Sequence, residues 1–136
     1  MEIGEFNKTI IEEFRANGGK VGGQFAGAPL LLLTTTGAKT GKTRVNPLAY
    51  LEDGDRYVII ASYAGADHNP PWYHNLLAHP DVTVEVGGER LDVHAAIVPE
   101  PQRTELYRKM ASIMPPFAEY ERKTARKIPV IALTRR

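Results

Sequence analysis

The chain contains no cysteine, and this absence excludes several kinds of site at once. Without thiols a protein has no disulfide, no thiolate metal site, no iron–sulfur cluster and no cysteine nucleophile. The longest apolar run, Pro29 to Leu33, is far shorter than the ~20 residues that span a bilayer. The N-terminal segment, Met1 to Glu5, is acidic where a signal peptide is basic. We therefore expect a cytoplasmic protein whose fold depends on apolar burial.

The chain also has little net charge, because 17 basic residues face 16 acidic ones. With 43% hydrophobic and 24% charged residues, the composition is typical of one globular domain over residues 1–136. The charge is uneven, since nine basic and three acidic residues lie between Arg103 and Arg136. Because of this basic third, binding to a polyanion or to the inner face of a membrane stays open as a hypothesis. Nucleic acid is not an expected partner, because Tyr107 and Tyr120 are the only tyrosines among those cations and offer few rings to stack on bases.

Hydrophobic spacing predicts an antiparallel sheet with helices inserted between its hairpins. Residues 1–19 are expected to form an amphipathic helix, joined through the glycine-rich link at Gly22 and Gly23 to a barrel over 28–136. Apolar runs and alternating patterns predict strands at 30–35, 44–51, 56–62, 82–86, 91–97 and 128–134. Helices are expected over 70–77, with Asn69 as N-cap, over 101–113 and over 120–126. The expected fold class is α+β, with six or seven antiparallel strands curled into a barrel.

The loop 34–44 carries the strongest chemical signal. Its two glycines let backbone N–H groups converge on an anion, while Lys39, Lys42 and Arg44 add positive charge with no acid among them. The Gly-x3-Gly-Lys-Thr spacing is one residue short of a Walker A motif and a strand follows it, which excludes a P-loop NTPase. The alternative is a solvated turn with ordinary surface lysines.

The segment 69–77 places the single tryptophan, a tyrosine, a histidine and an asparagine at the start of a short helix. A flat aromatic ligand could lie against these side chains. The i,i+4 pairs Trp72–Leu76 and Tyr73–Leu77 equally fit a helix that packs its apolar face on the barrel.

The remaining polar residues form no recognisable motif for a metal centre or a hydrolase. His68, His74 and His79 are six and five residues apart, whereas ligands on one helical face are three or four apart, so we expect no metal. Ser62 lies in no Gly-x-Ser-x-Gly elbow. It follows an apolar strand where the chain opens into a loop, which is a common place for binding groups.

Three segments, taken together and in order, resemble the deazaflavin-dependent nitroreductase family, a flavin-reductase-like group. They are 37–48, Ala61–Ala66 and Asn69–Leu76, and the resemblance runs from about Phe6 to the C-terminus. It implies a split β-barrel that binds coenzyme F420, a flat deazaflavin joined by a phosphodiester to an oligoglutamate tail. The cofactor-binding residues that it implies are Ala38, Lys39, Thr40, Gly41, Lys42, Arg44, Val45, Asn46, Pro47, Leu48, Ala49, Ile60, Ala61, Ser62, Tyr63, Pro71, Trp72, Tyr73, His74 and Asn75.

The same resemblance implies hydride transfer from reduced F420 to a small electrophilic acceptor such as a quinone, an enone or an activated nitro compound. Ser62 and Tyr120 are the expected catalytic donors of a proton or hydrogen bond, with Tyr63 behind them. Met114, Phe117 and Tyr120 would line the substrate side, although core packing explains their three-residue spacing equally well. Members that reduce bulky nitroimidazoles have a tyrosine-rich face there, so quinone or enone reduction is the expected activity. An FMN-dependent split-barrel reductase and a non-catalytic F420 carrier stay open as alternatives, as do a monomer and a homodimer.

Overall fold

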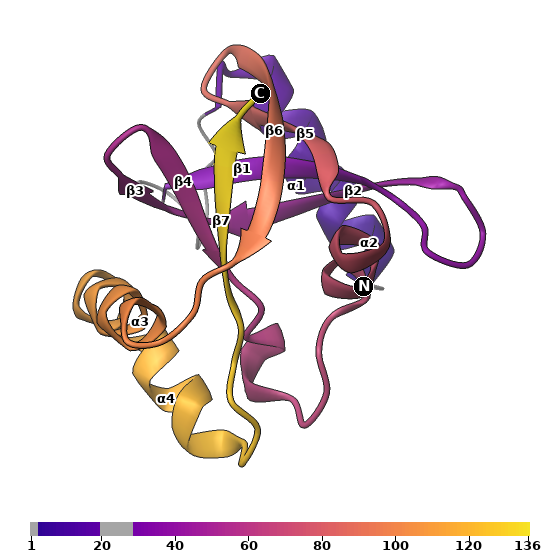
Figure 1. Cartoon of the computed structure of the whole chain (residues 1–136). Coiled ribbons are helices and arrows are strands. Elements are labelled where there is room, and N and C mark those ends of the chain that lie inside the picture. The colour runs from indigo at the N-terminus through magenta and orange to yellow at the C-terminus, as the bar shows by residue number, and fades with distance from the viewer. Residues whose placement is uncertain (1–2, 20–28) are drawn as a thin grey trace.

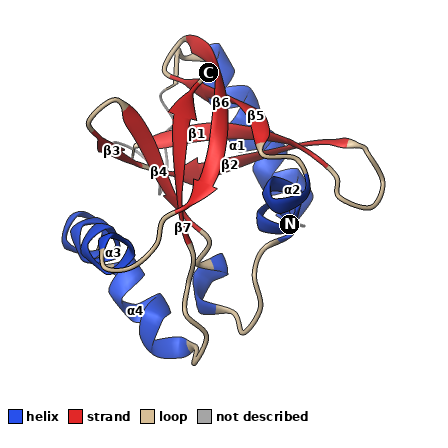
Figure 2. Ribbon diagram, in the orientation of Figure 1, coloured by secondary structure: helices blue, strands red, loops and turns tan. Residues whose placement is uncertain are grey.

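The computed structural model describes residues 3–19 and 29–136, and the predicted glycine-rich link at Gly22 and Gly23 lies outside them (Figures 1 and 2). The strands are β1 (Leu30–Thr36), β2 (Thr43–Ala49), β3 (Leu51–Asp53), β4 (Arg56–Ile60), β5 (Asp81–Val86), β6 (Glu89–Ile97) and β7 (Val130–Arg135). The helical elements are α1 (Ile3–Ala16), the 3₁₀ turn η2 (Tyr63–Gly65), α2 (Pro71–Ala78), α3 (Gln102–Ile113) and α4 (Pro116–Lys123).

All seven strands belong to one antiparallel sheet in the order β2-β1-β5-β6-β7-β4-β3. Tyr50 alone separates β2 from β3 along the chain, although these strands lie at opposite ends of that order. The two edges of the sheet are therefore covalently continuous, and β2 also contacts β4. This continuity curls the sheet into the barrel drawn in Figure 2, which confirms the predicted α+β split barrel.

The barrel interior is filled by alternate side chains of its strands together with one end of α2. Leu31 and Leu33 of β1 point into this core, where Trp72 and Leu76 of α2 join them. The packing interpretation of the pair Trp72–Leu76 is therefore confirmed. It is wrong for the second pair, because Leu77 is 54% exposed.

The outer face of β1 is covered by α1. Ile10 and Phe14 of the helix form a second apolar cluster with Leu30 and Leu32, so β1 is buried on both faces. Arg15 donates to both carboxylate oxygens of Glu85 at 3.0 and 2.9 Å. The helix therefore braces the barrel on this side.

A third cluster lies where α3 and α4 cover the outer faces of β4 and β7. Tyr107 and Met110 of α3 are 1% and 0% exposed there, packed with Val58 of β4 and with Val130 and Ala132 of β7. Both strands thus have two buried faces. Figure 1 shows α3 and α4 together on this side of the sheet.

Several predicted boundaries were wrong. The strand expected at 44–51 is interrupted at Tyr50, because Ala49 pairs with Leu30 on one side of the barrel while Leu51 pairs with Val58 on the other. The strand expected at 56–62 ends at Ile60. The helix expected at 120–126 is α4, which starts earlier because proline favours the first helical turn, and it ends before Thr124, whose backbone is extended.

Candidate functional site

The basic loop 37–42 between β1 and β2 is closed by its own hydrogen bonds. The Gly37 N–H donates to the carbonyl of Lys42 at 2.8 Å, and the Gly41 N–H donates back to the carbonyl of Gly37 at 3.0 Å. Thr40 Oγ1 accepts the N–H of Lys42 at 3.2 Å. Gly41 has a φ of +69°, which a residue with a side chain rarely adopts. The loop is therefore a defined turn that extends away from the barrel (Figure 1).

The two cations of this loop and Arg44, just beyond it in β2, have no acidic partner. Lys39, Lys42 and Arg44 are exposed. Within residues 3–19 and 29–136, none of the ion pairs closer than 4.0 Å includes them. Three unpaired cations close together attract an anionic ligand. The positive charge predicted for this loop is therefore available to an anionic ligand.

Asn75 of α2 ties the basic loop to the barrel. Its side chain is buried, with Oδ1 accepting the N–H of Ala38 at 2.9 Å and Nδ2 donating to Thr35 Oγ1 at 3.1 Å. The amide group therefore has a protein partner at both ends. Asn75 supports the loop from behind, and a direct contact between its side chain and a ligand stays a prediction.

Replacing Asn75 by alanine is expected to lower the free energy of unfolding by about 1–3 kcal/mol. The change leaves the buried Thr35 hydroxyl and the part-buried Ala38 N–H without their partner, and an unsatisfied buried polar group costs about that much. Urea denaturation measures the difference. His79→Ala is the control, since its exposed side chain follows the same helix. Equal stability of the two variants would contradict this account of the loop.

Ser62, one of the two predicted donors, lies directly before the turn η2, and Tyr63, predicted to lie behind them, begins it. Ser62 is buried at 8% exposure, directly before the turn. Tyr63 is 44% exposed and has a φ of +48°, a left-handed conformation that costs a non-glycine residue about 1–2 kcal/mol. Its ring meets His68 edge-on at 5.4 Å. The surrounding contacts must hold this turn in its strained conformation.

Helix α4 packs directly against this turn. Gly65 has a φ of +82°, and a Cβ placed on it would lie 2.9 Å from Lys123 Cβ and 3.1 Å from the carbonyl oxygen of Tyr120. The close approach brings the segment of Ser62 and Tyr63 against the helix that carries Tyr120. Three residues that the sequence singles out as proton donors therefore lie on two touching elements.

Gly65→Ala is expected to cost about 1–2 kcal/mol more stability than Gly54→Ala. Both positions have positive φ, so the backbone strain of an added Cβ is similar at each. Gly54 has no atom within 4 Å of the added carbon, whereas Gly65 meets Lys123 and Tyr120. Denaturation midpoints of the two variants isolate the packing against α4. A smaller loss at Gly65 than at Gly54 would contradict the contact.

Arg126 is the residue at this site that sequence reasoning missed. Its guanidinium donates to the carbonyl oxygens of Ala61, Ser62 and Ala66 and to Oδ1 of Asn69. The prediction of Asn69 as a helix cap was therefore wrong, since α2 begins after Pro70 with no side-chain cap. No motif marks Arg126 in the sequence, because its partners are backbone carbonyls far away along the chain.

Met114, Phe117 and Tyr120, the residues predicted to line the substrate side, form a half-buried wall that packs partly against the protein core. Met114, Phe117 and Tyr120 pack against the cluster under α3, and the rings of Phe117 and Tyr120 meet edge-on at 5.4 Å. The buried Tyr107 donates its hydroxyl to the carbonyl of Phe117 at 2.6 Å. Burial raises the pKa of Tyr107 to about 12, so this phenol keeps its proton at neutral pH. Contact of the wall with a substrate stays a prediction.

The other predicted cofactor residues divide by exposure. The side chains of Ile60, Ala61 and Trp72 are buried in apolar clusters, where a ligand has little access to them. Pro71 and His74 are exposed at the start of α2. Residues still half-exposed along β2 and α2 are Val45, Asn46, Pro47, Leu48, Ala49 and Tyr73.

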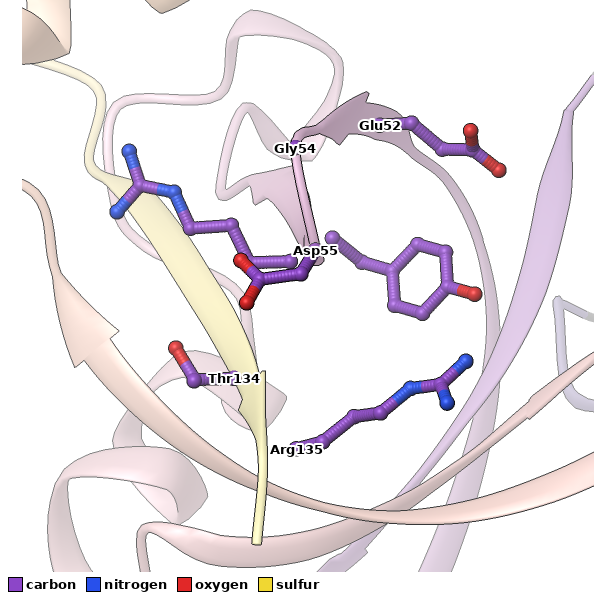
Figure 3. Close-up of a pocket in the computed structure, with 7 residues that line it drawn as sticks. Glu52, Gly54, Asp55, Thr134 and Arg135 are labelled. Carbon is purple, nitrogen blue, oxygen red and sulfur yellow. The ribbon is translucent and has the colours of Figure 1, made fainter.

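Two cavities of the described chain lie away from the basic loop. The first, of about 360 Å³, is at the opposite end of β4 from Ser62, and Figure 3 shows the β3–β4 turn on one side of it and the end of β7 on the other. Its lining residues are Glu52, Gly54, Asp55, Arg56, Tyr57, Thr134 and Arg135, none of them predicted for the site. The second, of about 260 Å³, includes Tyr73 together with the strand ends near Val98 and Val130.

Comparison with known proteins gives consistent results. The family model described as F420H(2)-dependent quinone reductase matches residues 7–135. An F420H(2)-dependent quinone reductase of Mycobacterium tuberculosis (strain H37Rv) is 43% identical over 129 residues, covering 90% of this chain and 85% of that protein. A solved F420-H2 dependent reductase has a TM-score of 0.71 at 40% identity, covering 77% of this chain and 93% of its own. A solved domain-swapped dimer has a TM-score of 0.73 at 35% identity, covering 95% of both chains.

Proposed function

The chain belongs to the F420H(2)-dependent quinone reductase family, and from this membership we propose that it reduces a quinone with reduced F420. The observation that carries the proposal is the acid-free basic loop, with Lys39, Lys42 and Arg44 exposed and unpaired. The relatives named as quinone reductases agree with the expectation of quinone over nitroimidazole reduction.

The residues present fit F420. Its phosphodiester and oligoglutamate carboxylates need cations and N–H donors, which Lys39, Lys42, Arg44 and the turn 37–41 present toward solvent. Its flat ring needs an apolar slot with a few polar groups, and β2 with the start of α2 offers half-exposed apolar side chains beside that loop. When bound, reduced F420 supplies a hydride from carbon 5 of its ring.

The chain itself contributes positioning and hydrogen bonding. Asn75 holds the basic loop, so the groups that bind the tail are fixed before the ligand arrives. The hydroxyls of Ser62 and Tyr120 would donate to the acceptor oxygen on which negative charge develops. Their elements touch at Gly65, and the aromatic wall of Phe117 and Tyr120 would exclude water from one side.

The experiment that tests the function is a fluorescence titration with oxidised F420 and, separately, with FMN. Reduced F420 and menadione are then added, and the deazaflavin absorbance is followed as it returns. Tight F420 binding with catalysed return is expected. Binding without turnover would favour the non-catalytic carrier, and binding of FMN alone would favour the FMN-dependent reductase, whose single terminal phosphate needs fewer cations.

We further propose that the protein forms a homodimer, because the domain-swapped dimer is 35% identical and aligns over 95% of both chains. Light scattering after size-exclusion chromatography distinguishes this state from the monomer.

We also propose a peripheral contact of α3 and α4 with an anionic membrane surface. Arg108, Lys109, Arg122 and Lys123 of these helices are exposed, and Ile113 at the end of α3 is 54% exposed. Among the described residues, no helix has the length and hydrophobicity needed to cross a bilayer. Stacking on nucleic acid finds no support here, since Tyr107 is 1% exposed. Salt-dependent sedimentation with anionic vesicles tests the membrane contact.

A further inference from the structure

A single guanidinium donates hydrogen bonds to four residues of the loop between β4 and α2. Arg126 donates through Nη2 to the carbonyl of Ser62 at 2.7 Å, through Nη1 to the carbonyl of Ala61 at 3.2 Å and to Asn69 Oδ1 at 2.7 Å. Through Nε it donates to the carbonyl of Ala66 at 2.8 Å. All four acceptors come from one segment of nine residues, 61–69, and none is a carboxylate.

The arrangement differs from an ordinary surface ion pair. Arg126 is partly buried, and burial lowers its pKa, while its hydrogen bonds go to three backbone carbonyls and one side-chain amide oxygen. The planar fork of arginine reaches several acceptors in fixed directions, which a lysine ammonium cannot reproduce.

The position of Arg126 links the two elements that carry the predicted donors. It follows α4 by three residues, and α4 packs on Gly65 through Tyr120 and Lys123. The turn η2 therefore contacts α4 at Gly65, and the guanidinium binds the carbonyls of Ser62 and Ala66 that flank it. Tyr63 lies in this turn, and its positive φ needs such external support.

We propose that Arg126 is a positioning residue for the reduction, because its hydrogen bonds hold the loop 61–69 against α4 and thereby fix the Ser62 hydroxyl relative to Tyr120. The proposal rests on the proposed function. Arg126 itself does not contact the reacting atoms. Its loss should impair proton delivery much more than it impairs binding of F420, which depends on the basic loop.

The first test needs no cofactor. Hydrogen–deuterium exchange is measured on Arg126→Lys and on the control Arg122→Lys, an exposed cation at the end of α4. We expect at least 10-fold faster exchange at Gly65 and Ala66, whose N–H groups donate to the carbonyls of Ser62 and Tyr63. Exchange in β4 and β7 should stay unchanged, and so should the control. Unchanged exchange at Gly65 and Ala66 would contradict the proposal that Arg126 holds the loop 61–69.

The second test uses the quinone assay. In Arg126→Lys we expect kcat to fall about 10-fold or more, with the F420 Kd and the quinone KM within about 2-fold of wild type and a larger solvent deuterium isotope effect on kcat. Arg126→Ala should lose more, and Arg122→Lys should match wild type. A parallel loss of kcat and F420 affinity would overturn the positioning role and indicate a general structural one. A wild-type protein without turnover would overturn the proposed function and this role with it. The exchange rates would still show whether Arg126 holds the loop 61–69.

Discussion

Replacing Lys39, Lys42 and Arg44 together by glutamine is expected to weaken F420 binding by about 100-fold. Each cation faces solvent without an acidic partner, so its charge is free for the phosphodiester and carboxylates of the cofactor. A charge-assisted contact at an exposed site contributes about 1 kcal/mol, and three such contacts amount to about 3 kcal/mol. Since about 1.4 kcal/mol corresponds to a factor of ten, the Kd should rise by about two orders of magnitude.

Fluorescence titration with oxidised F420 measures this Kd at two salt concentrations. The matched control replaces three other exposed cations, Arg108, Lys109 and Arg122, and so removes the same formal charge from α3 and α4. If the control weakened F420 binding as much as the loop variant, long-range charge rather than the loop would account for binding. The basic C-terminal third would then be the anion-binding surface.

The elements that sequence reasoning predicted best are those fixed by local chemistry. Asp53-Gly54 is the turn of the hairpin β3–β4 and Gly87-Gly88 that of the hairpin β5–β6, although most of the strand expected at 44–51 pairs with β1 and not with β4. The basic loop was also readable, because its charges and glycines are contiguous. Local pattern thus predicted a basic loop whose cations the structure leaves exposed and unpaired.

Features that depend on distant parts of the chain could not be read in the same way. The break at Tyr50 follows from the pairing of β2 and β3 with different strands, and no local residue preference requires it. Arg126 looks like any cation of the basic third until the fold places it against carbonyls about 60 residues away. Asn75 was predicted to bind the cofactor, which stays a prediction, whereas its partners Thr35 and Ala38 emerged from the fold alone.

The second large effect concerns the proton donors. We expect the double variant Ser62→Ala with Tyr120→Phe to lose about 100-fold in kcat while the F420 Kd changes by less than about 2-fold. Hydrogen-bond donors aimed at developing charge contribute at least this much to catalysis, and both substitutions remove the donor while preserving size. Single variants should each lose less, because either hydroxyl can partly replace the other on touching elements.

Stopped-flow reduction of menadione by reduced F420 measures this loss, with the solvent isotope effect as a second readout. The control combines Ser112→Ala with Tyr57→Phe, which removes the same two hydroxyl types from an exposed turn of α3 and from the opposite end of β4. Unchanged turnover in the site variant would show that solvent supplies the proton. In that case Ser62 and Tyr120 would shape the acceptor pocket, and the close contact between η2 and α4 would serve to exclude water rather than to deliver a proton.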